Sequence, residues 1–414
     1  MKKILNFLCL FFCVAFCLSS CVKPTSKLVP GIWRGALVAE SGVEIPFNFE
    51  VVDSLEKPII YILNSTEKFK VDEITLFDDS IHIKMPLFDS EFKGILKGGK
   101  INGVWIKHLA DTDEVLNFYA KSNSKWRFKE KAAEARFNIE GKWKTTFISE
   151  DGVDTTNAIG EFVQNKSKVT GTFLTPTGDY RFLEGMIEGN TLALSTFDGS
   201  HAFLFTAKIN KDSTMTEGKF YSGFSYLENF TAKRDEFIEL TDAYSLTYLK
   251  DGADQIKFTF PNLKDEAISL SDEKFKNKVV IVQMLGSWCP NCMDETAFLS
   301  KYYQKNKSRG LEIIGLAYER SKDFEKNKKN IGRLVNRFNV EYDILATGFT
   351  NDKAEAAKSL PMLNKVIAFP TMIVIDKKGT VREIHTGFSG PGTGNYYINF
   401  VNQFDNMMNK LLAE

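Results

Sequence analysis

The 414-residue sequence has few cysteines and no net charge, and each scarcity excludes a class of protein. Six cysteines are too few for a disulfide scaffold in a chain of this length. Lys and Arg number 53, as do Asp and Glu, so the charge balance excludes a broad electrostatic basis for nucleic-acid binding. Hydrophobic residues make up 43% of the chain, which is enough to form buried cores and argues against wholesale disorder. The length favours two or three domains.

The longest apolar run lies at the N-terminus. Lys2 and Lys3 precede an almost wholly apolar stretch over residues 4–18, which is short for a membrane span but typical of a signal-peptide core. It ends in Leu-Ser-Ser-Cys at Cys21, which resembles the lipobox of bacterial lipoproteins, where the cysteine carries the lipid. We predict a lipoprotein signal peptide over residues 1–20 and lipidation of Cys21. The alternative is ordinary secretory cleavage, with Cys21 an incidental thiol.

A short polar tether over residues 21–30 follows the predicted lipidation site. No later apolar stretch approaches 18 residues, so the lipid would be the membrane anchor. The tether lacks the acidic run that resembles a surface-export signal in some bacterial lipoproteins. We therefore expect a protein of the bacterial cell envelope, lipid-anchored and facing the periplasm.

Two stretches in the middle of the chain resemble each other. Trp33 matches Trp143 at an offset of 110 residues, and the Phe-Asp pair at 88 matches the one at 197 at an offset of 109. Offsets that change so little indicate a duplication with small differences in loops, and repeats of this length are whole domains. We assign β repeat 1 to residues 31–124 and β repeat 2 to residues 139–235.

Each repeat is predicted to consist of short strands. Residues 81–85 and 191–197 alternate apolar and polar side chains, which is typical of half-buried strands, and turn-forming sequences separate the strands. About eight strands per repeat favour an antiparallel meander, closed into a barrel or folded into a sandwich. Such a barrel can hold a small ligand, but no polar cluster marks a site, so we favour a scaffold or docking role. His82, His108 and His201 lack metal-ligand spacing.

A linker over residues 236–252 leads to the C-terminal domain, residues 253–414. The unbroken apolar run at residues 279–285 predicts a strand buried on both faces. The motif Cys289-Pro-Asn-Cys292 follows it, then an amphipathic helix and another apolar strand at residues 311–317. This order is a βαβ unit with a redox motif at the carboxyl end of its first strand. Further helices are predicted over residues 352–359 and 396–412, the second preceded by a glycine-rich turn.

The spacing of the two cysteines suits thiol chemistry. Cysteines in the first turn of a helix lie close enough to form a disulfide, and the backbone N–H groups and helix dipole favour the thiolate at Cys289. Cys289 should be the more exposed and is assigned as the nucleophile, and Cys292 as the resolving cysteine. A zinc site would need two further ligands, and a structural disulfide would close too short a loop to stabilise much. We expect no metal and no cofactor beyond the redox-active pair.

Taken together, these motifs resemble the TlpA/ResA-like branch of the thioredoxin superfamily. The resemblance rests on residues 278–292 (KVVIVQMLGSWCPNC) and on Phe369-Pro370-Thr371, which matches the family's cis-proline loop. It implies a cis peptide bond before Pro370 and a substrate-binding surface formed by Trp288, Phe369, Pro370 and Thr371. It also implies that the backbone of Phe369 pairs with an extended substrate segment.

Two further positions refine the resemblance. Gln283 lies six residues before Cys289, where cytosolic-type thioredoxins carry a buried aspartate, and an amide cannot shuttle a proton. Glu295 matches a glutamate that follows the CxxC motif in the TlpA/ResA-like branch, and on a helix it shares a face with Cys292. We predict that Glu295 transfers protons for the resolving thiol. The alternative is a solvated acid in the first turn of a helix.

The predicted fold is multidomain, with two all-β repeats followed by an α/β thioredoxin-like domain. The predicted function is a membrane-tethered periplasmic thiol-disulfide oxidoreductase that reduces disulfides in client proteins and is recharged by a membrane electron donor. One alternative is a binding lipoprotein whose repeats capture a ligand or partner, with the redox domain as an accessory. A thiol peroxidase is a weaker alternative, because that resemblance needs Thr or Ser at the position of Gly286 and Pro at that of Val282.

Overall fold

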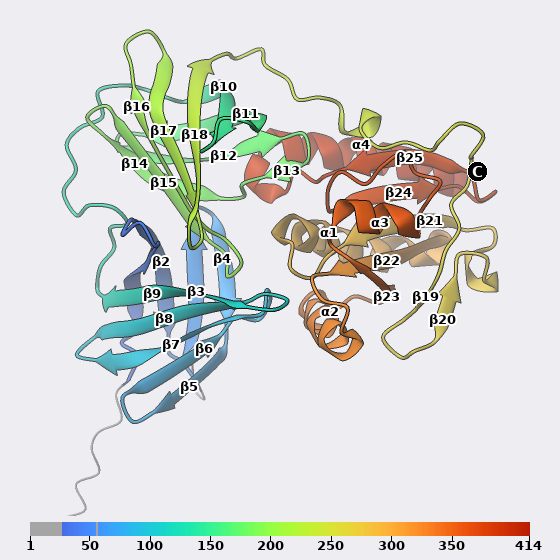
Figure 1. Cartoon of the computed structure of the whole chain (residues 1–414), viewed down its shortest axis with the longest axis horizontal. Helices are drawn as coiled ribbons and strands as arrows, with labels where there is room; N and C mark the ends of the chain where they lie inside the picture. Colours follow the sequence, from blue (N-terminus) through green and yellow to red (C-terminus); the bar gives the residue numbers. More distant parts are fainter. Residues whose placement is uncertain (1–26, 55–56) are drawn as a thin grey trace, which may run out of the picture.

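The computed structural model describes residues 27–54 and 57–414 (Figure 1). The predicted signal peptide, the predicted lipidation residue Cys21 and most of the predicted tether lie outside these ranges. Within them, no helix is long and apolar enough to cross a membrane.

Residues 31–122 form the first β unit, an antiparallel sheet of nine strands in the order β4-β3-β2-β1-β9-β8-β7-β6-β5. Apolar side chains alternate toward the interior, as the period of two along a strand requires. The strands are β1 Gly31–Val38, β2 Glu44–Val52, β3 Ile59–Asn64, β4 Glu67–Val71, β5 Glu73–Phe77, β6 Ser80–Lys84, β7 Ser90–Lys97, β8 Lys100–His108 and β9 Asp113–Ser122.

Residues 141–234 form the second β unit, also with nine antiparallel strands, in the order β11-β10-β18-β17-β16-β15-β14-β12-β13. The strands are β10 Gly141–Ser149, β11 Thr155–Asn165, β12 Lys168–Thr175, β13 Gly178–Asp179, β14 Leu183–Glu188, β15 Thr191–Phe197, β16 Ala202–Ile209, β17 Thr214–Ser222 and β18 Tyr226–Arg234. The strand number exceeds the expected eight by one in each unit.

The two units share local detail but differ in closure. Each begins with a buried tryptophan, Trp33 or Trp143, whose indole N–H donates at 2.8 Å to a carbonyl four residues earlier. In the second unit β12 pairs with both β14 and β11, which closes the sheet into a barrel. In the described part of the first unit β4 and β5 end the sheet, which is therefore barrel-like but open.

The C-terminal domain is thioredoxin-like, with a five-stranded mixed sheet in the order β23-β22-β21-β24-β25. Strands β21 to β23 are parallel, and β24 and β25 are antiparallel to their neighbours. The strands of this sheet are β21 Val279–Leu285, β22 Leu311–Glu319, β23 Asp343–Thr350, β24 Thr371–Ile375 and β25 Val381–Thr386. Before it, β19 Thr259–Pro261 and β20 Ala267–Ser269 form a separate two-stranded sheet. The helices are α1 Pro290–Asn306, α2 Phe324–Phe338, α3 Lys353–Ser359 and α4 Asn395–Ala413, with short 3-10 helices η1 Ala243–Ser245, η2 Glu273–Phe275, η3 Lys307–Arg309 and η4 Pro391–Thr393.

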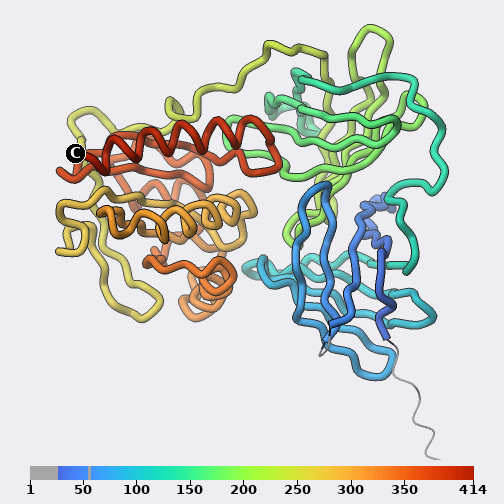
Figure 2. The backbone as a smooth tube through the Cα atoms, turned by 180° about the vertical axis from the view of Figure 1, so that it is seen from behind, coloured from blue at the N-terminus to red at the C-terminus, as the bar shows by residue number. Residues whose placement is uncertain are grey.

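The three parts pack against one another. Figure 1 shows the two β units one above the other, with the C-terminal domain beside both. In Figure 2, residues 236–252 cross from the second unit to the C-terminal domain as an extended segment that contains η1. Thr247 in this segment accepts a hydrogen bond from Thr386 of β25 at 2.8 Å. The start of α1 faces the second unit, where Arg181 Nη1 donates to the carbonyl of Pro290 at 3.4 Å.

Candidate active site

The two cysteines lie where β21 ends and α1 begins. All seven residues of β21 are buried between β22 and β24, as the unbroken apolar run predicts. Cys289 is the N-cap of α1, and Pro290 occupies the first helical position, where its missing N–H leaves no bond unmade. The Cys289 Sγ accepts a hydrogen bond from the Cys292 N–H at 3.2 Å. Both cysteines are free thiols.

The register of β24 brings the proline loop to the cysteines. β24 runs antiparallel to β21, and Thr371 pairs with Met284 near the end of β21. The Phe369–Pro370 peptide bond is cis, and the carbonyl oxygen of Phe369 lies 3.4 Å from the Cys289 Sγ. Residues far apart in the sequence therefore meet at one point.

The other residues assigned to substrate binding surround this point. The Trp288 ring packs edge-on against Phe369, with the centroids 5.9 Å apart, and its indole N–H donates to the carbonyl of Tyr318 at 2.9 Å. The Thr371 hydroxyl donates to the carbonyl of Ala368 at 2.9 Å. Trp288 and Thr371 are thus held by the fold itself, and their side-chain bonds fix the shape of the surface.

The two thiols differ slightly in exposure, and burial acts strongly on the second. Cys289 is 5% exposed and Cys292 is 0% exposed, so the order is the expected one, but the assigned nucleophile is itself buried. Burial raises the pKa of Cys292 well above its ordinary value, and the hydrogen bond and charge of Cys289 raise it further. The resolving thiol therefore holds its proton until a base takes it.

Glu295 follows Cys292 by one turn of α1, and its charge raises the pKa of the Cys292 thiol. It is fully buried on α1, which rules out the solvated alternative. The Gln283 Nε2 donates to Glu295 Oε2 at 2.9 Å and to the Thr296 hydroxyl at 3.1 Å, while no described residue hydrogen-bonds to Glu295 Oε1. Burial raises the pKa of Glu295 to about 8, although the bond from Gln283 lowers it. An acid of this pKa exchanges a proton readily near neutral pH.

A second buried acid supports the loop before the cysteines, and the sequence patterns did not identify it. Glu319 accepts hydrogen bonds from the Ser287 N–H at 2.8 Å and from the Ser287 hydroxyl at 2.6 Å. Burial raises the pKa of Glu319 despite these bonds. Its position at the end of β22 was the only available signal, because carboxyl ends of parallel strands gather at one edge of a sheet.

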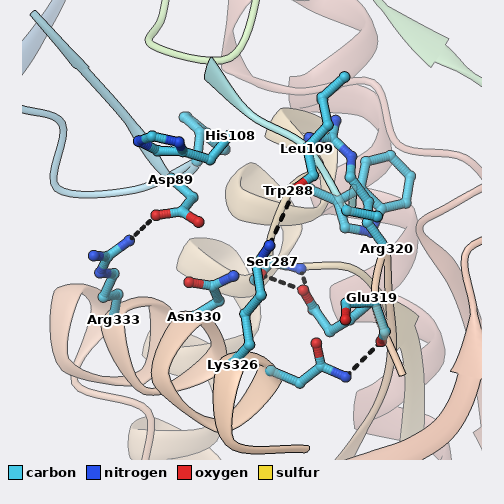
Figure 3. A pocket seen from close by; sticks show the side chains of 14 residues that line it. Asp89, His108, Leu109, Ser287, Trp288, Glu319, Arg320, Lys326, Asn330 and Arg333 are labelled. Carbon is cyan, nitrogen blue, oxygen red and sulfur yellow. Dashed lines mark hydrogen bonds and ion pairs between the residues drawn. The ribbon is translucent and has the colours of Figure 1, made fainter. Parts of the chain in front are cut away.

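A small cavity separates this loop from the first β unit (Figure 3). Trp288 and Arg320 line one side, with the guanidinium 5.3 Å from the ring centroid. Asp89 from the first unit forms an ion pair with Arg333 at 3.0 Å across the cavity, and Lys326 donates to the carbonyl of Leu109 at 3.0 Å. The first unit therefore contacts α2 directly beside the active-site tryptophan. Among residues 27–54 and 57–414, no cluster of His, Cys, Asp and Glu has the arrangement of a metal site.

Comparison with known proteins relates the C-terminal region to a family. Residues 252–384 match the model of the AhpC/TSA family. The thiol-disulfide oxidoreductase ResA of Halalkalibacterium halodurans is 25% identical over 170 residues, which cover 40% of this chain and 78% of that protein. ResA of Bacillus thuringiensis subsp. konkukian is 30% identical over 130 residues, covering 31% and 66% respectively. The thioredoxin-like protein YneN of Bacillus subtilis is 25% identical over 139 residues, covering 34% and 73%.

Solved structures are similar over the same share of the chain. The thioredoxin domain of a thiol-disulfide oxidoreductase from Bacteroides vulgatus is 23% identical, with a TM-score of 0.28, and covers 38% of this chain and 99% of that one. A thiol-disulfide oxidoreductase from Bacteroides fragilis is 21% identical, with a TM-score of 0.27, and covers 36% and 99%.

Proposed function

We propose that the protein is a thiol-disulfide oxidoreductase that reduces disulfides in client proteins. The observation that carries the proposal is the arrangement at the start of α1. Cys289 caps the helix, Cys292 lies one turn on, and Glu295 is buried on the same face one turn further. This arrangement supplies a nucleophile, a resolving thiol and a proton acceptor in sequence. The names of the relatives listed above agree with this chemistry.

The reaction proceeds in two exchanges. The Cys289 thiolate attacks one sulfur of the client disulfide, so that a mixed disulfide forms and the other client sulfur leaves as a thiolate. Cys292 then gives its proton to the Glu295 carboxylate and attacks the Cys289 sulfur. The second client thiolate leaves, and Cys289 and Cys292 end as a disulfide. Two electrons pass to the client, and an external dithiol must return them.

The proposal includes the cellular setting predicted from the sequence. Lipid on Cys21 would hold the protein at the membrane of the bacterial cell envelope, with its domains in the periplasm. Because that compartment is oxidising, a membrane electron donor would have to reduce the Cys289–Cys292 disulfide after each cycle. The β units would serve as scaffold or docking surfaces, which is supported by the aromatic rings that fill the second barrel.

The direction of electron flow is tested by the reduction potential. The purified chain is equilibrated with defined ratios of reduced and oxidised glutathione or dithiothreitol, and the Cys289–Cys292 disulfide is quantified by mass spectrometry. A reductase requires a potential well below that of a strong oxidant such as DsbA, which is about −120 mV. A value near that figure would overturn the reductase proposal.

The AhpC/TSA match favours testing a second function, a thiol peroxidase. Such an enzyme would need Thr or Ser at position 286, but a Cβ there would lie 2.1 Å from the Trp288 indole nitrogen, so only glycine fits. Position 282 is Val rather than Pro. We expect no hydrogen peroxide consumption by the reduced chain above that of a Cys289→Ser control. Turnover of peroxide that depends on Cys289 would favour the peroxidase instead.

A further inference from the structure

The second β unit covers the surface that a client would have to reach. Carbonyl groups on both sides of Cys289 receive hydrogen bonds from it: the Ser200 hydroxyl donates to Trp288 at 3.3 Å, and Arg181 Nη1 donates to Pro290 at 3.4 Å. Pro290 is buried, as is the cis-proline loop opposite. These contacts flank Cys289 in the sequence, and Cys289 itself is 5% exposed. The donors lie on two connecting segments, residues 176–181, which include the two-residue strand β13, and residues 198–201; they are called the covering loops below.

The first covering loop also binds the residues between and after the cysteines. The Asp179 carboxylate accepts from the Gly390 N–H at 2.7 Å and from the amide of Asn291 at 3.4 Å. Asn291 stands between Cys289 and Cys292 in the sequence. A Cβ on Gly392 would lie 3.0 Å from the backbone carbon of Arg181. The loop therefore packs at backbone distance against the redox domain.

Arg181 joins all three parts of the molecule. It forms ion pairs with Asp294 on α1 of the redox domain and with Glu67 on β4 of the first unit, and Asp198 lies 3.7 Å away in its own unit. Its side chain is 3% exposed. Burial alone would lower the pKa of Arg181, but Asp294 and Glu67 hold it well above its ordinary value. Removal of one member of such a buried network leaves uncompensated charges and is strongly destabilising.

The first β unit completes the enclosure on the other side of Trp288. Its contacts with α2, described above, border a small pocket beside Trp288 (Figure 3). With Cys289 only 5% exposed, a client disulfide has little access to its sulfur in this arrangement.

We propose that the structure is a closed resting state in which the covering loops block the dithiol, and that the redox domain must separate from them before a client binds. This inference rests on the proposed reductase function for its biological sense, but the blockage itself is a property of the fold. Because thiol reactivity requires access as well as the thiolate, the closed state protects the reduced dithiol from unspecific oxidation. Release exposes Trp288, Phe369 and Pro370 together with Cys289.

The test measures access to Cys289 directly. The reduced full-length chain is treated with iodoacetamide and, separately, with a polymer-bearing maleimide, and the alkylation rate of Cys289 is followed by peptide-resolved mass spectrometry. Two variants should open the closed state by different means. Arg181→Ala removes the shared cation, and Gly392→Val inserts a side chain against the backbone of the first covering loop. We expect each to raise the Cys289 rate by at least about tenfold, more for the polymer reagent.

Arg234→Ala is the matched control, because Arg234 lies in the same unit and pairs with Glu236 at 3.0 Å, away from the redox domain. Its Cys289 rate should equal that of the unaltered chain. Thermal unfolding identifies a variant that fails to fold, in which case the other variant decides. Folded variants that alkylate at the unaltered rate would overturn the closed state. Insulin reduction, measured in parallel, separates the two proposals: faster alkylation without any reductase activity would refute the function but support the blockage.

Discussion

The two β units carry the same kind of sheet but stabilise it differently. The second closes on itself and encloses its own core, in which Phe147, Phe173, Phe205 and Phe230 contact one another. The open first unit shares its core with the second unit. The ring of Phe197 from the second unit packs on the ring of Phe47, with the ring centroids 4.6 Å apart. In a closed barrel every strand pairs with two neighbours, so no edge strand has unpaired backbone groups. An open sheet has two edge strands and depends on neighbouring segments to cover them.

The loops that follow β6 and β15 show how equivalent segments serve different interfaces. Both carry Phe-Asp, at 88 and at 197. Asp89 pairs with Arg333 on the redox domain and remains partly exposed. Asp198 is 1% exposed, and although burial would raise its pKa, His201 and Arg181 hold the pKa at about 2. The strands therefore form the same kind of sheet in both units, while the loops between strands determine which neighbouring part of the molecule each unit contacts.

The largest expected effect concerns independent folding. Residues 135–236, expressed alone, should fold cooperatively because the second unit contains its whole core. Residues 27–130 alone should not, because the first unit loses Phe197, Ala202 and Leu204 of its neighbour from its core. Circular dichroism and thermal unfolding of both fragments check this. A cooperative transition in the first fragment would contradict the contrast.

Removal of the shared phenylalanine should have the next largest effect. Phe197→Ala takes a fully buried ring from between Phe47, Phe92 and Trp105 and should lower the free energy of unfolding by about 3–5 kcal/mol. Phe88→Ala, its counterpart, removes a ring stacked at 6.4 Å on Phe69 and should lower it less. Denaturant titration of both variants measures the difference. Equal losses would show that the open unit does not depend on its neighbour.

A third prediction contrasts a buried acid that has cations beside it, Asp198, with one that has none, Glu295. The pKa of Glu295 is raised to about 8 by burial, so the folded state binds a proton that the unfolded state releases above its ordinary pKa. The contribution of this group to the free energy of unfolding is therefore complete at low pH. As the pH rises from the ordinary pKa of a glutamate to the folded pKa of Glu295, the free energy of unfolding falls by about 1.4 kcal/mol per pH unit.

Glu295→Gln should remove this dependence, so that the variant is more stable than the unaltered chain at pH 8, and it should also remove an inflection near that pH from the rate of insulin reduction. Glu325→Gln, at an exposed position of α2, is the control and should change neither. Asp198→Asn should act in the opposite sense. The low pKa of Asp198 means that its contribution is present at neutral pH and is lost only in acid, so the variant should be less stable at pH 7. Parallel pH profiles for the Glu295 variant and the unaltered chain would refute its role.

The smallest expected effect is at the first unit's contact with α2. Arg333→Ala removes an ion pair whose two side chains are 30% and 27% exposed, so unfolding stability should fall by no more than about 1 kcal/mol. The loss of unfolding free energy is compared with the loss caused by Arg181→Ala in the same denaturant titration. A smaller loss from Arg333→Ala shows that the second unit binds the redox domain more strongly than the first. A larger loss from Arg333→Ala than from Arg181→Ala would reverse that assignment.

Local patterns predicted much of the redox domain. The run at residues 279–285 coincides with β21, and the predicted helices 352–359 and 396–412 lie within a residue of α3 and α4. These elements follow from continuous apolar or helix-forming stretches, which are properties of neighbouring residues. The positions of the cysteines and Glu295 on α1 follow from helix spacing in the same way.

The arrangement of the domains could not be predicted, because it depends on residues far apart in sequence. Closure of the second barrel requires pairing between β11 and β12 in addition to β12 and β14, which no strand pattern specifies. Glu67 and Asp294 lie 114 and 113 residues from Arg181, and nothing near any of the three marks a partner. The sequence also did not predict that Cys289 is buried, because its exposure depends on which distant segments pack around it, such as the loop of Phe369.

The most direct test of the central claim is to trap the first exchange. Cys292→Ser should leave Cys289 able to attack a client but unable to release it, so that client proteins accumulate in mixed disulfides with Cys289. Cys289→Ser, the matched control, should trap none, because Cys292 is fully buried. Mass spectrometry of the trapped species then identifies the bonded cysteine. Mixed disulfides at Cys289 in the first variant alone are the predicted result. Their absence, with Cys289 shown to be reduced beforehand, would contradict the proposed mechanism.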